Sequence, residues 1–422
     1  MLIDRQADRV CRFFVYIGAP ANSYNKKGGI RMFRKIVCFV AAVSMMTLGF
    51  FNDLKIVSAE DDEFKTIDDL ISNCGCENIA VYEANTKTLL GGKESNKKKY
   101  ISHLTKLMTA LLVYDNIENG NISYDTKLIT SEHANSMTGI QIWLDVGEEI
   151  TVDELIKAIT ISNANDAAVV LAEGCCGSEK SFVGKMNQRA RELGMSSTHF
   201  DDCTGISHKN VSTAADMAVL TGELAKNSVF EEYYMMRIAN VGRKGSQLVT
   251  QNKLVNNYKG CCGYKSCYDE EAGGMLSAAS KQRDMAICVV LIGGNDNDMI
   301  FDEAKAVMTY AFTHNEVYYP EIPSEALAKI PVEHGQKPFA KAEIADSKDI
   351  IIKRGSYRQI YTELDRKELL QAPVNKGDKI GILIFKNDKG EILRCTVTAA
   401  EDVKKTDFFF AFKCLLLNLF NI

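Results

Sequence analysis

The stretch YISHLTKLMTALL, residues 100–112, places two groups that could take part in chemistry one helical turn apart. His103 stands three residues before Lys106, at the position where a hydroxyl nucleophile activated by an amine would lie. Ser102 offers a hydroxyl one residue earlier, where it could face Lys106 at i, i+4. However, one residue turns a helix by about 100°. The pattern therefore places an amine one helical turn from an imidazole, with a hydroxyl one residue earlier.

Two further clusters carry polar groups of the same kind. Asn163 and Asn165 flank an alanine and present two side-chain amides just before the apolar stretch DAAVVLAE. The second cluster is KSC, which ends at Cys267 and places an amine, a hydroxyl and a thiol in a row. An acyl-transfer site needs an activated hydroxyl and two backbone N–H groups for the oxyanion. The amine is present here, and the activated hydroxyl is in doubt.

These clusters resemble the motifs of the D-alanyl-D-alanine carboxypeptidases, the low-molecular-mass penicillin-binding proteins of the serine DD-peptidase group. TVDELIKAI, NANDAAVVLAE, FVGKMNQRARELGMSSTHF and EEAGGMLSAAS extend the resemblance, which runs from about Asn78 to the C-terminus. In that family an S-x-x-K serine attacks the stem-peptide carbonyl and the lysine takes its proton. An S-x-N motif completes the relay, and a K-T-G strand binds the terminal carboxylate. The corresponding motifs here are HLTK, NAN and KSC.

The first two altered motifs affect the nucleophile and the proton relay. An imidazole at His103 is far bulkier than a hydroxymethyl group, and its acyl product hydrolyses readily, so the serine mechanism does not transfer. Asn165 keeps the family's substrate-facing amide, whereas Asn163 replaces the relay hydroxyl with an amide that cannot pass on a proton. Ser162 again lies one position away. The resemblance thus implies a site with its nucleophile and relay hydroxyl replaced.

The third motif affects substrate binding. The resemblance assigns Lys265 and Ser266 to the terminal carboxylate, and Cys267 puts a side chain where glycine lets a substrate backbone approach closely. Asp269 stands where the family has a threonine and would repel a carboxylate. The oxyanion hole would be formed by backbone N–H groups near positions 103 and 268. We therefore expect weaker binding of a D-Ala-D-Ala terminus as well as impaired hydrolysis.

Three functional hypotheses follow from the resemblance. The first is a catalytically impaired carboxypeptidase homologue of peptidoglycan metabolism that binds cell-wall peptide, a β-lactam or a partner protein. The second is an active serine-type carboxypeptidase that removes the terminal D-Ala of stem peptides, with Ser102 as nucleophile or with a rearranged helix start, and with Lys106 as base. The third is a non-catalytic wall-associated binding or structural protein. No metal or organic cofactor is implied.

The sequence predicts an α/β (α+β) transpeptidase/β-lactamase-like domain with a helical subdomain, followed by a small all-β domain. Residues 78–95 suggest two strands around an N-T-K turn, and the apolar run at 285–294 a buried central strand. Residues 151–177 suggest two helices. Thr151 starts a capping box with Glu154, and Gly174 is a candidate stop signal.

The chain divides into five predicted segments. Residues 1–31 form an extension ahead of the true start at Met32, residues 32–59 a signal peptide, and residues 60–330 the DD-peptidase-like domain. Residues 331–402 form the β domain, and residues 403–422 an amphipathic tail that associates with the membrane surface. A retained membrane helix in place of the signal peptide is the alternative. We expect an exported protein, peripheral on the outer face of the cytoplasmic membrane.

The net charge and the cysteine spacing argue against a nucleic-acid-binding protein, a disulfide-rich protein and a zinc protein. The net charge is −5, and removal of residues 1–59 takes away nine basic and three acidic residues and leaves −11, with no basic stripe for nucleic acid. The cysteines lack the spacing of a disulfide framework or a zinc site, so most are expected to be free thiols. Asp166 is expected to support its helix, and Arg283 to be a surface charge. Five histidines show no metal or triad spacing: His133, His199, His208, His314 and His334.

Overall fold

The computed structural model describes residues 64–255, 257–296 and 298–419. The predicted N-terminal extension, 1–31, and the predicted signal peptide, 32–59, lie outside these residues. The first described helix, α3, spans Ile67–Ser72 and begins with a capping box between Thr66 and Asp69.

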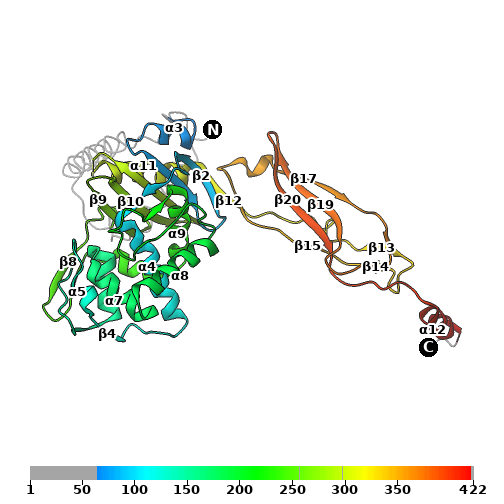
Figure 1. Cartoon of the computed structure of the whole chain (residues 1–422). Helices are drawn as coiled ribbons and strands as arrows, with labels where there is room; N and C mark the ends of the chain where they lie inside the picture. The colour runs from blue at the N-terminus through cyan, green and yellow to red at the C-terminus, as the bar shows by residue number, and fades with distance from the viewer. Residues whose placement is uncertain (1–63, 256, 297, 420–422) are drawn as a thin grey trace, which may run out of the picture. The chain divides into compact units, whose positions relative to one another are not determined.

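A five-stranded antiparallel sheet with the order β2-β1-β11-β10-β9 forms the centre of the first domain (Figure 1). The strands span Asn78–Glu83 (β1), Thr88–Lys93 (β2), Cys261–Asp269 (β9), Gly273–Gln282 (β10) and Met285–Gly294 (β11). The predicted hairpin around the N-T-K turn and the predicted central strand at 285–294 are both confirmed. Strand β11 lies in the middle because its apolar side chains are buried on both faces.

Alternate residues of the central strands enter two separate cores. In β1, Ala80 and Tyr82 belong to the core under the helical subdomain, whereas Ile79 and Val81 face the other core. Helix α9, Ala214–Ala225, covers the first face, and α3 and α11, Met299–His314, cover the second (Figure 1). The sheet is therefore sandwiched between helices, as the predicted α/β class requires.

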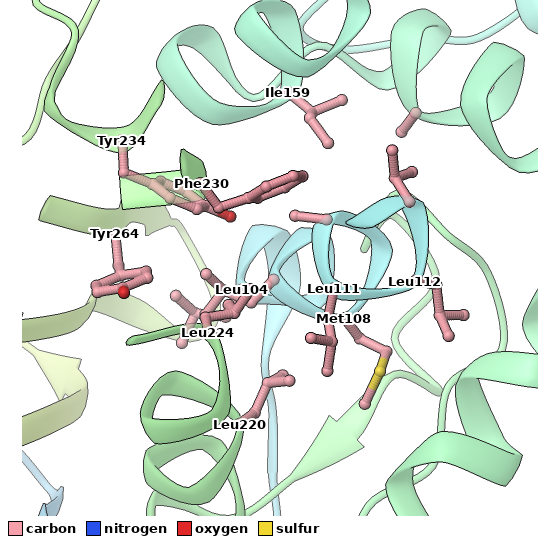
Figure 2. Packing of buried hydrophobic residues seen from close by; sticks show 14 of the residues in the cluster. Leu104, Met108, Leu111, Leu112, Ile159, Leu220, Leu224, Phe230, Tyr234 and Tyr264 are labelled. Carbon is pink, nitrogen blue, oxygen red and sulfur yellow. The ribbon is translucent and has the colours of Figure 1, made fainter. Parts of the chain in front are cut away.

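The helical subdomain packs around α4, which continues a single 3₁₀ turn, η1. Figure 2 shows Leu104, Met108 and Leu111 beside the α9 side chains Leu220 and Leu224. The other helical segments of this subdomain surround α4. The bounds are Ser102–Thr105 (η1), Lys106–Glu118 (α4), Glu132–Asn135 (α5), Val152–Lys157 (α6), Ala158–Ser162 (η2, a π turn), Asn165–Cys176 (α7), Glu179–Glu192 (α8) and Ser228–Met235 (α10).

The prediction for residues 151–177 is confirmed at its start and wrong at its end. Thr151 and Glu154 form the capping box of α6. Helix α7 runs through Gly174 and ends at Gly177, whose φ of 75° is left-handed. A Cβ at Gly174 would lie 2.4 Å from Leu128 Cδ1, so this glycine allows a close packing contact instead of ending the helix.

Short two-stranded ribbons connect these elements. Strand β3 pairs with β6, β4 with β5, and β7 with β8. Their bounds are Lys99–Tyr100 (β3), Lys127–Ile129 (β4), Glu149–Thr151 (β5), Val211–Ser212 (β6), Ile238–Val241 (β7) and Ser246–Val249 (β8).

The C-terminal part is rich in strands and has its own apolar core, in which Leu383, Phe385 and Val397 are fully buried. Its largest sheet has the order β15-β20-β19-β17. The predicted all-β domain is therefore present, while its limits at 331 and 402 stay predictions. The elements are Asn315–Tyr318 (β12), Ile330–Glu333 (β13), Phe339–Ala340 (β14), Ala342–Ile344 (β15), Ile350–Lys353 (β16), Ser356–Gln359 (η3), Tyr361–Arg366 (β17), Leu370–Gln371 (β18), Lys379–Asn387 (β19) and Gly390–Ala399 (β20).

A last helix, α12, spans Phe408–Leu419. Within the part of the chain that the structure describes, no helix has both the length and the apolar character needed to cross a membrane.

Gly205 provides a test of how the loop after α8 meets the start of α4. Its φ is 87°, and an added Cβ would lie 2.0 Å from the carbonyl oxygen of Ser102. We expect Gly205→Ala to lower the free energy of unfolding by about 2 kcal/mol or more, measured by urea denaturation. In α8, a Cβ at the exposed Gly184 meets nothing within 4 Å, so Gly184→Ala should gain up to about 1 kcal/mol. Equal effects of the two substitutions would contradict this packing.

Candidate active site

Lys106, the first residue of α4, is fully buried with its amine held by three acceptors. Its Nζ donates to Asn165 Oδ1 at 2.6 Å and to the carbonyl oxygen of Thr204 at 2.5 Å, and lies 3.2 Å from His103 Nδ1. Burial lowers the pKa of Lys106 to about 8. The amine therefore remains charged near neutral pH and donates all three contacts.

His103 is neutral in this arrangement. Burial, and then the charges of Lys106 and Lys265, lower its pKa to about 3. Because a charged lysine can only donate, His103 Nδ1 must accept, which leaves the proton on Nε2. The one unprotonated ring nitrogen thus faces Lys106, and no free lone pair remains for attack on an acyl group.

Ser102 does not face the amine. It has a left-handed φ of 39°, its side chain is buried, and its Oγ donates to Asp269 Oδ2 at 3.3 Å. The helix register predicted that Ser102 could face Lys106 but would point away from the groove that the family uses; in the structure its hydroxyl contacts Asp269 and not Lys106. Ser102 could act as a nucleophile only if the start of α4 rearranged.

The amide of Asn165 is oriented by the loop before α6. Its Nδ2 donates to the carbonyl oxygen of Thr138 at 2.7 Å, and its backbone N–H donates to that of Ile140 at 2.7 Å. Oδ1 is thereby turned toward Lys106. The resemblance assigned Asn165 a substrate-facing amide; in the structure this amide bonds to Lys106 and to the carbonyl oxygen of Thr138.

Asn163 lies at the end of the π turn with a left-handed φ of 66°. Its Oδ1 accepts from Lys265 Nζ at 2.6 Å, and its Nδ2 is 3.4 Å from the carbonyl oxygen of Ser266. The neighbouring Ser162 donates its hydroxyl to the carbonyl oxygen of Ala158 at 2.9 Å. Neither residue at the second motif therefore offers a free hydroxyl for a proton relay.

Lys265 lies on β9 and is also buried. Besides Asn163, its Nζ donates to the carbonyl oxygens of Ile159 and Thr160. Burial, and then the charge of Lys106, hold its pKa well below the usual value for lysine. The two amines of the site are thus each held beside a side-chain amide.

Cys267 fills the position after Ser266 with a thiol that is 4% exposed. Burial raises the pKa of Cys267 to about 12, although the backbone N–H of His103 and the charges of Lys265 and Lys106 act in the opposite direction. A thiolate–imidazolium pair would need a low thiol pKa and a basic imidazole. Neither condition holds, so Cys267 does not replace the missing serine as a nucleophile.

Several residues that the sequence did not single out complete the site. The Asp202 carboxylate accepts from the backbone N–H groups of Thr204, Gly205 and Ser207, and so shapes the loop that binds Lys106. Tyr100 donates to the carbonyl oxygen of Gly205 and stacks on His208 at 4.6 Å. In the sequence, the D-C-T-G turn at residues 202–205 was the signal that could have identified this loop as part of the site. Arg283 lies at the far end of β10 and takes no part.

Among the described residues, no group of three or more His, Cys, Asp and Glu side chains is placed to hold a metal ion. All eleven cysteines between residues 64 and 419 are free thiols.

The neutral His103 can be tested by acid titration. Its folded pKa of about 3 lies below the unfolded value of 6.5, so between these pH values the unfolded chain binds a proton that the folded chain does not. Stability should therefore fall, by at most about 1.4 kcal/mol per pH unit, as pH drops through this window. We expect urea denaturation to show a greater loss of stability across this window in the wild type than in His103→Gln, with a difference of at most this slope. An NMR titration with a midpoint near 6.5 for His103 would contradict the geometry.

Comparisons with known proteins identify the family. A family model described as D-alanyl-D-alanine carboxypeptidase matches residues 71–296, and one described as Penicillin-binding protein 5, C-terminal domain, matches residues 322–405. D-alanyl-D-alanine carboxypeptidase DacF of Bacillus subtilis (strain 168) is 33% identical over 341 residues, 79% of this chain and 87% of the relative. DacA of Escherichia coli (strain K12) is 25% identical over 362 residues, 83% of this chain and 89% of the relative.

Solved structures agree on the fold. Penicillin binding protein 5 from Haemophilus influenzae has a TM-score of 0.71 at 22% identity, and the match covers 79% of this chain and 98% of the other. The DacD carboxypeptidase from Francisella tularensis has a TM-score of 0.64 at 21% identity, covering 78% and 94%. From its family match and its curated relatives, the chain belongs to the D-alanyl-D-alanine carboxypeptidase family of penicillin-binding proteins, which act in cell-wall metabolism.

Proposed function

We propose that this protein is an exported carboxypeptidase homologue that binds peptidoglycan stem peptide without serine acyl transfer. One observation carries the proposal: the amine of Lys106 lies 3.2 Å from the imidazole of His103, at the position where the family has its serine. Among the residues that the structure describes, no hydroxyl hydrogen-bonds to this amine. Without a nucleophile the acyl-enzyme cannot form, and losses of this kind cost several orders of magnitude in rate.

The relay and the oxyanion position support the same proposal. In the family's reaction a serine Oγ attacks the peptide carbonyl, its proton passes to the lysine, and the amide nitrogen of the leaving D-Ala takes up a proton. The Asn163 amide cannot pass on a proton, and both of its polar groups already have partners. Cys267 adds a side chain beside the His103 N–H that would stabilise the oxyanion. Three requirements of acyl transfer are thus altered independently.

The retained groups favour binding over a purely structural role. Lys265 and Ser266 keep the amine and hydroxyl that the family uses for a terminal carboxylate. Asp269 lies 3.3 Å from Ser102 and opposes a carboxylate, so affinity for a D-Ala-D-Ala terminus should be reduced rather than absent. The alternative, an active carboxypeptidase with Ser102 as nucleophile, requires Ser102 to leave Asp269 and turn toward Lys106.

Labelling with a fluorescent penicillin tests the missing nucleophile. Purified full chain should show no covalent adduct by intact mass under conditions in which an active carboxypeptidase labels fully. Ser102→Ala should behave like the wild type. A stoichiometric adduct that maps to Ser102 and disappears in Ser102→Ala would establish the active alternative.

A graded set of substitutions serves as the matched control for the same assay. His103→Ser alone should label slowly or not at all, because the relay and the oxyanion position are still altered. His103→Ser combined with Asn163→Ser and Cys267→Gly should label fastest, since it restores hydroxyl, relay and close backbone approach. Full labelling by His103→Ser alone would show that the other two changes are inconsequential. Thermal melting should accompany each variant to exclude loss of folding.

We also propose that α12 holds the protein at the membrane surface. Residues Lys404 and Lys405 precede the helix and are exposed, and could meet anionic headgroups. The helix exposes five large apolar side chains to solvent by more than half: Phe408, Phe409, Phe412, Leu415 and Leu419. Such exposure is costly in water and is typical of helices that lie in the membrane interface.

Co-sedimentation with anionic phospholipid vesicles tests this membrane contact. We expect the double substitution Phe409→Glu and Phe412→Glu to weaken binding at least about tenfold, because two aromatic side chains would no longer enter the interface. Phe339→Glu, at a 48% exposed phenylalanine of the β domain, is the matched control and should bind like the wild type. Equal vesicle binding by the wild type, the double variant and Phe339→Glu would show that α12 does not make the membrane contact.

A further inference from the structure

Trp143 is an exposed aromatic side chain in a backbone conformation that bulky residues rarely adopt. It is the only tryptophan of the chain, its side chain is 66% exposed, and its φ is 62°. Among the described residues, no aromatic ring, cation or hydrogen-bond acceptor contacts its indole. A strained and unpartnered aromatic group suggests a functional role, because folding alone gains nothing from it.

The surrounding loop holds Trp143 outward. The buried Asp166 carboxylate accepts from the backbone N–H groups of Ile142 at 3.1 Å and Leu144 at 3.3 Å. The side chains of these two neighbours are 4% and 2% exposed, so both point into the core and the residue between them points to solvent. Lys244 adds a contact from its Nζ to the carbonyl oxygen of Trp143 at 2.9 Å. The indole is thus presented by a rigid frame.

The same loop forms a wall of the candidate active site. The carbonyl oxygens of Thr138 and Ile140 each accept from Asn165 at 2.7 Å, and Asn165 in turn binds Lys106. Trp143 is three residues beyond Ile140, so their Cα atoms are at most about 11 Å apart. An extended peptide of five residues spans roughly 17 Å. The loop that holds Asn165 beside Lys106 therefore also carries Trp143, and a peptide that extends from the site along this loop would approach the indole.

The side chains near Trp143 on this loop fit a peptide. Ile140 and Val146 are 39% and 55% exposed and extend the apolar surface. Asp145 pairs with both Arg243 and Lys244, so the carboxylate is fully paired and one positive charge remains beside the apolar face of the indole. An apolar face next to paired charges suits methyl and methylene groups of an extended peptide better than a free ion.

We propose that Trp143 is a specificity-determining residue that packs against the stem peptide as it leaves the site along this loop. This inference rests on the proposed function, since it requires that the site binds stem peptide. It adds an anchor that is independent of the altered catalytic motifs. Peptide binding would then persist although the residues at the altered motifs, His103, Asn163 and Cys267, do not support acyl transfer.

The single tryptophan makes the test direct. A synthetic stem pentapeptide ending in D-Ala-D-Ala is titrated into the full chain while intrinsic tryptophan fluorescence and calorimetric heat are followed. We expect a saturable emission change with the midpoint of the calorimetric isotherm. Trp143→Ala should weaken calorimetric affinity at least about tenfold, whereas Trp143→Phe should stay within about threefold. Tyr361→Ala, at a 52% exposed aromatic residue of the β domain, should bind like the wild type.

The two readouts separate this inference from the proposed function. Heat of binding without an emission change, together with wild-type affinity of Trp143→Ala, would overturn the role of Trp143 and leave stem-peptide binding standing. Absence of heat for the wild type would overturn peptide binding itself and Trp143's role with it. Thermal melting of Trp143→Ala must match the wild type for its lower affinity to count in favour.

Discussion

The burial of one amine determines much of this molecule. Lys106 Nζ joins three segments that are far apart in sequence: the start of α4, the start of α7 through Asn165, and the loop at Thr204. A buried ammonium is tolerated only when acceptors surround it, and removing it would leave two buried acceptors without a donor. The lysine therefore has a structural role that remains when the nucleophile is gone. Retention of the catalytic amine is, for this reason, weak evidence for retained catalysis.

The second buried amine follows the same principle and explains the altered second motif. Lys265 donates to the amide oxygen of Asn163, and the amide nitrogen faces the carbonyl oxygen of Ser266. A serine hydroxyl could satisfy one of these groups, whereas an asparagine amide spans both. The Asn163 amide thus links the π turn to β9 through both of its polar groups.

Local patterns in the sequence predicted the helices and strands well, but they did not predict the contacts between residues that are distant in sequence. The N-T-K hairpin, the apolar run of β11 and the capping box at Thr151 depend on neighbours in sequence, and all were predicted. Gly174 was misjudged because its partner, Leu128, comes from a distant strand. The partners of Ser102 and Lys265 were equally beyond prediction, since Asp269 and Asn163 lie more than 100 residues away. The sequence identified the motif residues, but it did not predict which residues would form hydrogen bonds with them.

These occupied hydrogen bonds limit what the site can do. Lys106, Lys265 and Cys267 are at most 4% exposed, and their polar atoms already face partners within the chain. A ligand can gain little binding free energy from these buried groups, because it must replace hydrogen bonds of similar strength. Affinity would then come from the wall formed by the Trp143 loop, where Ile140, Trp143 and Val146 expose apolar surface. Hydrolysis, in contrast, depends on the buried groups, so in this geometry binding and cutting are separable properties of one fold.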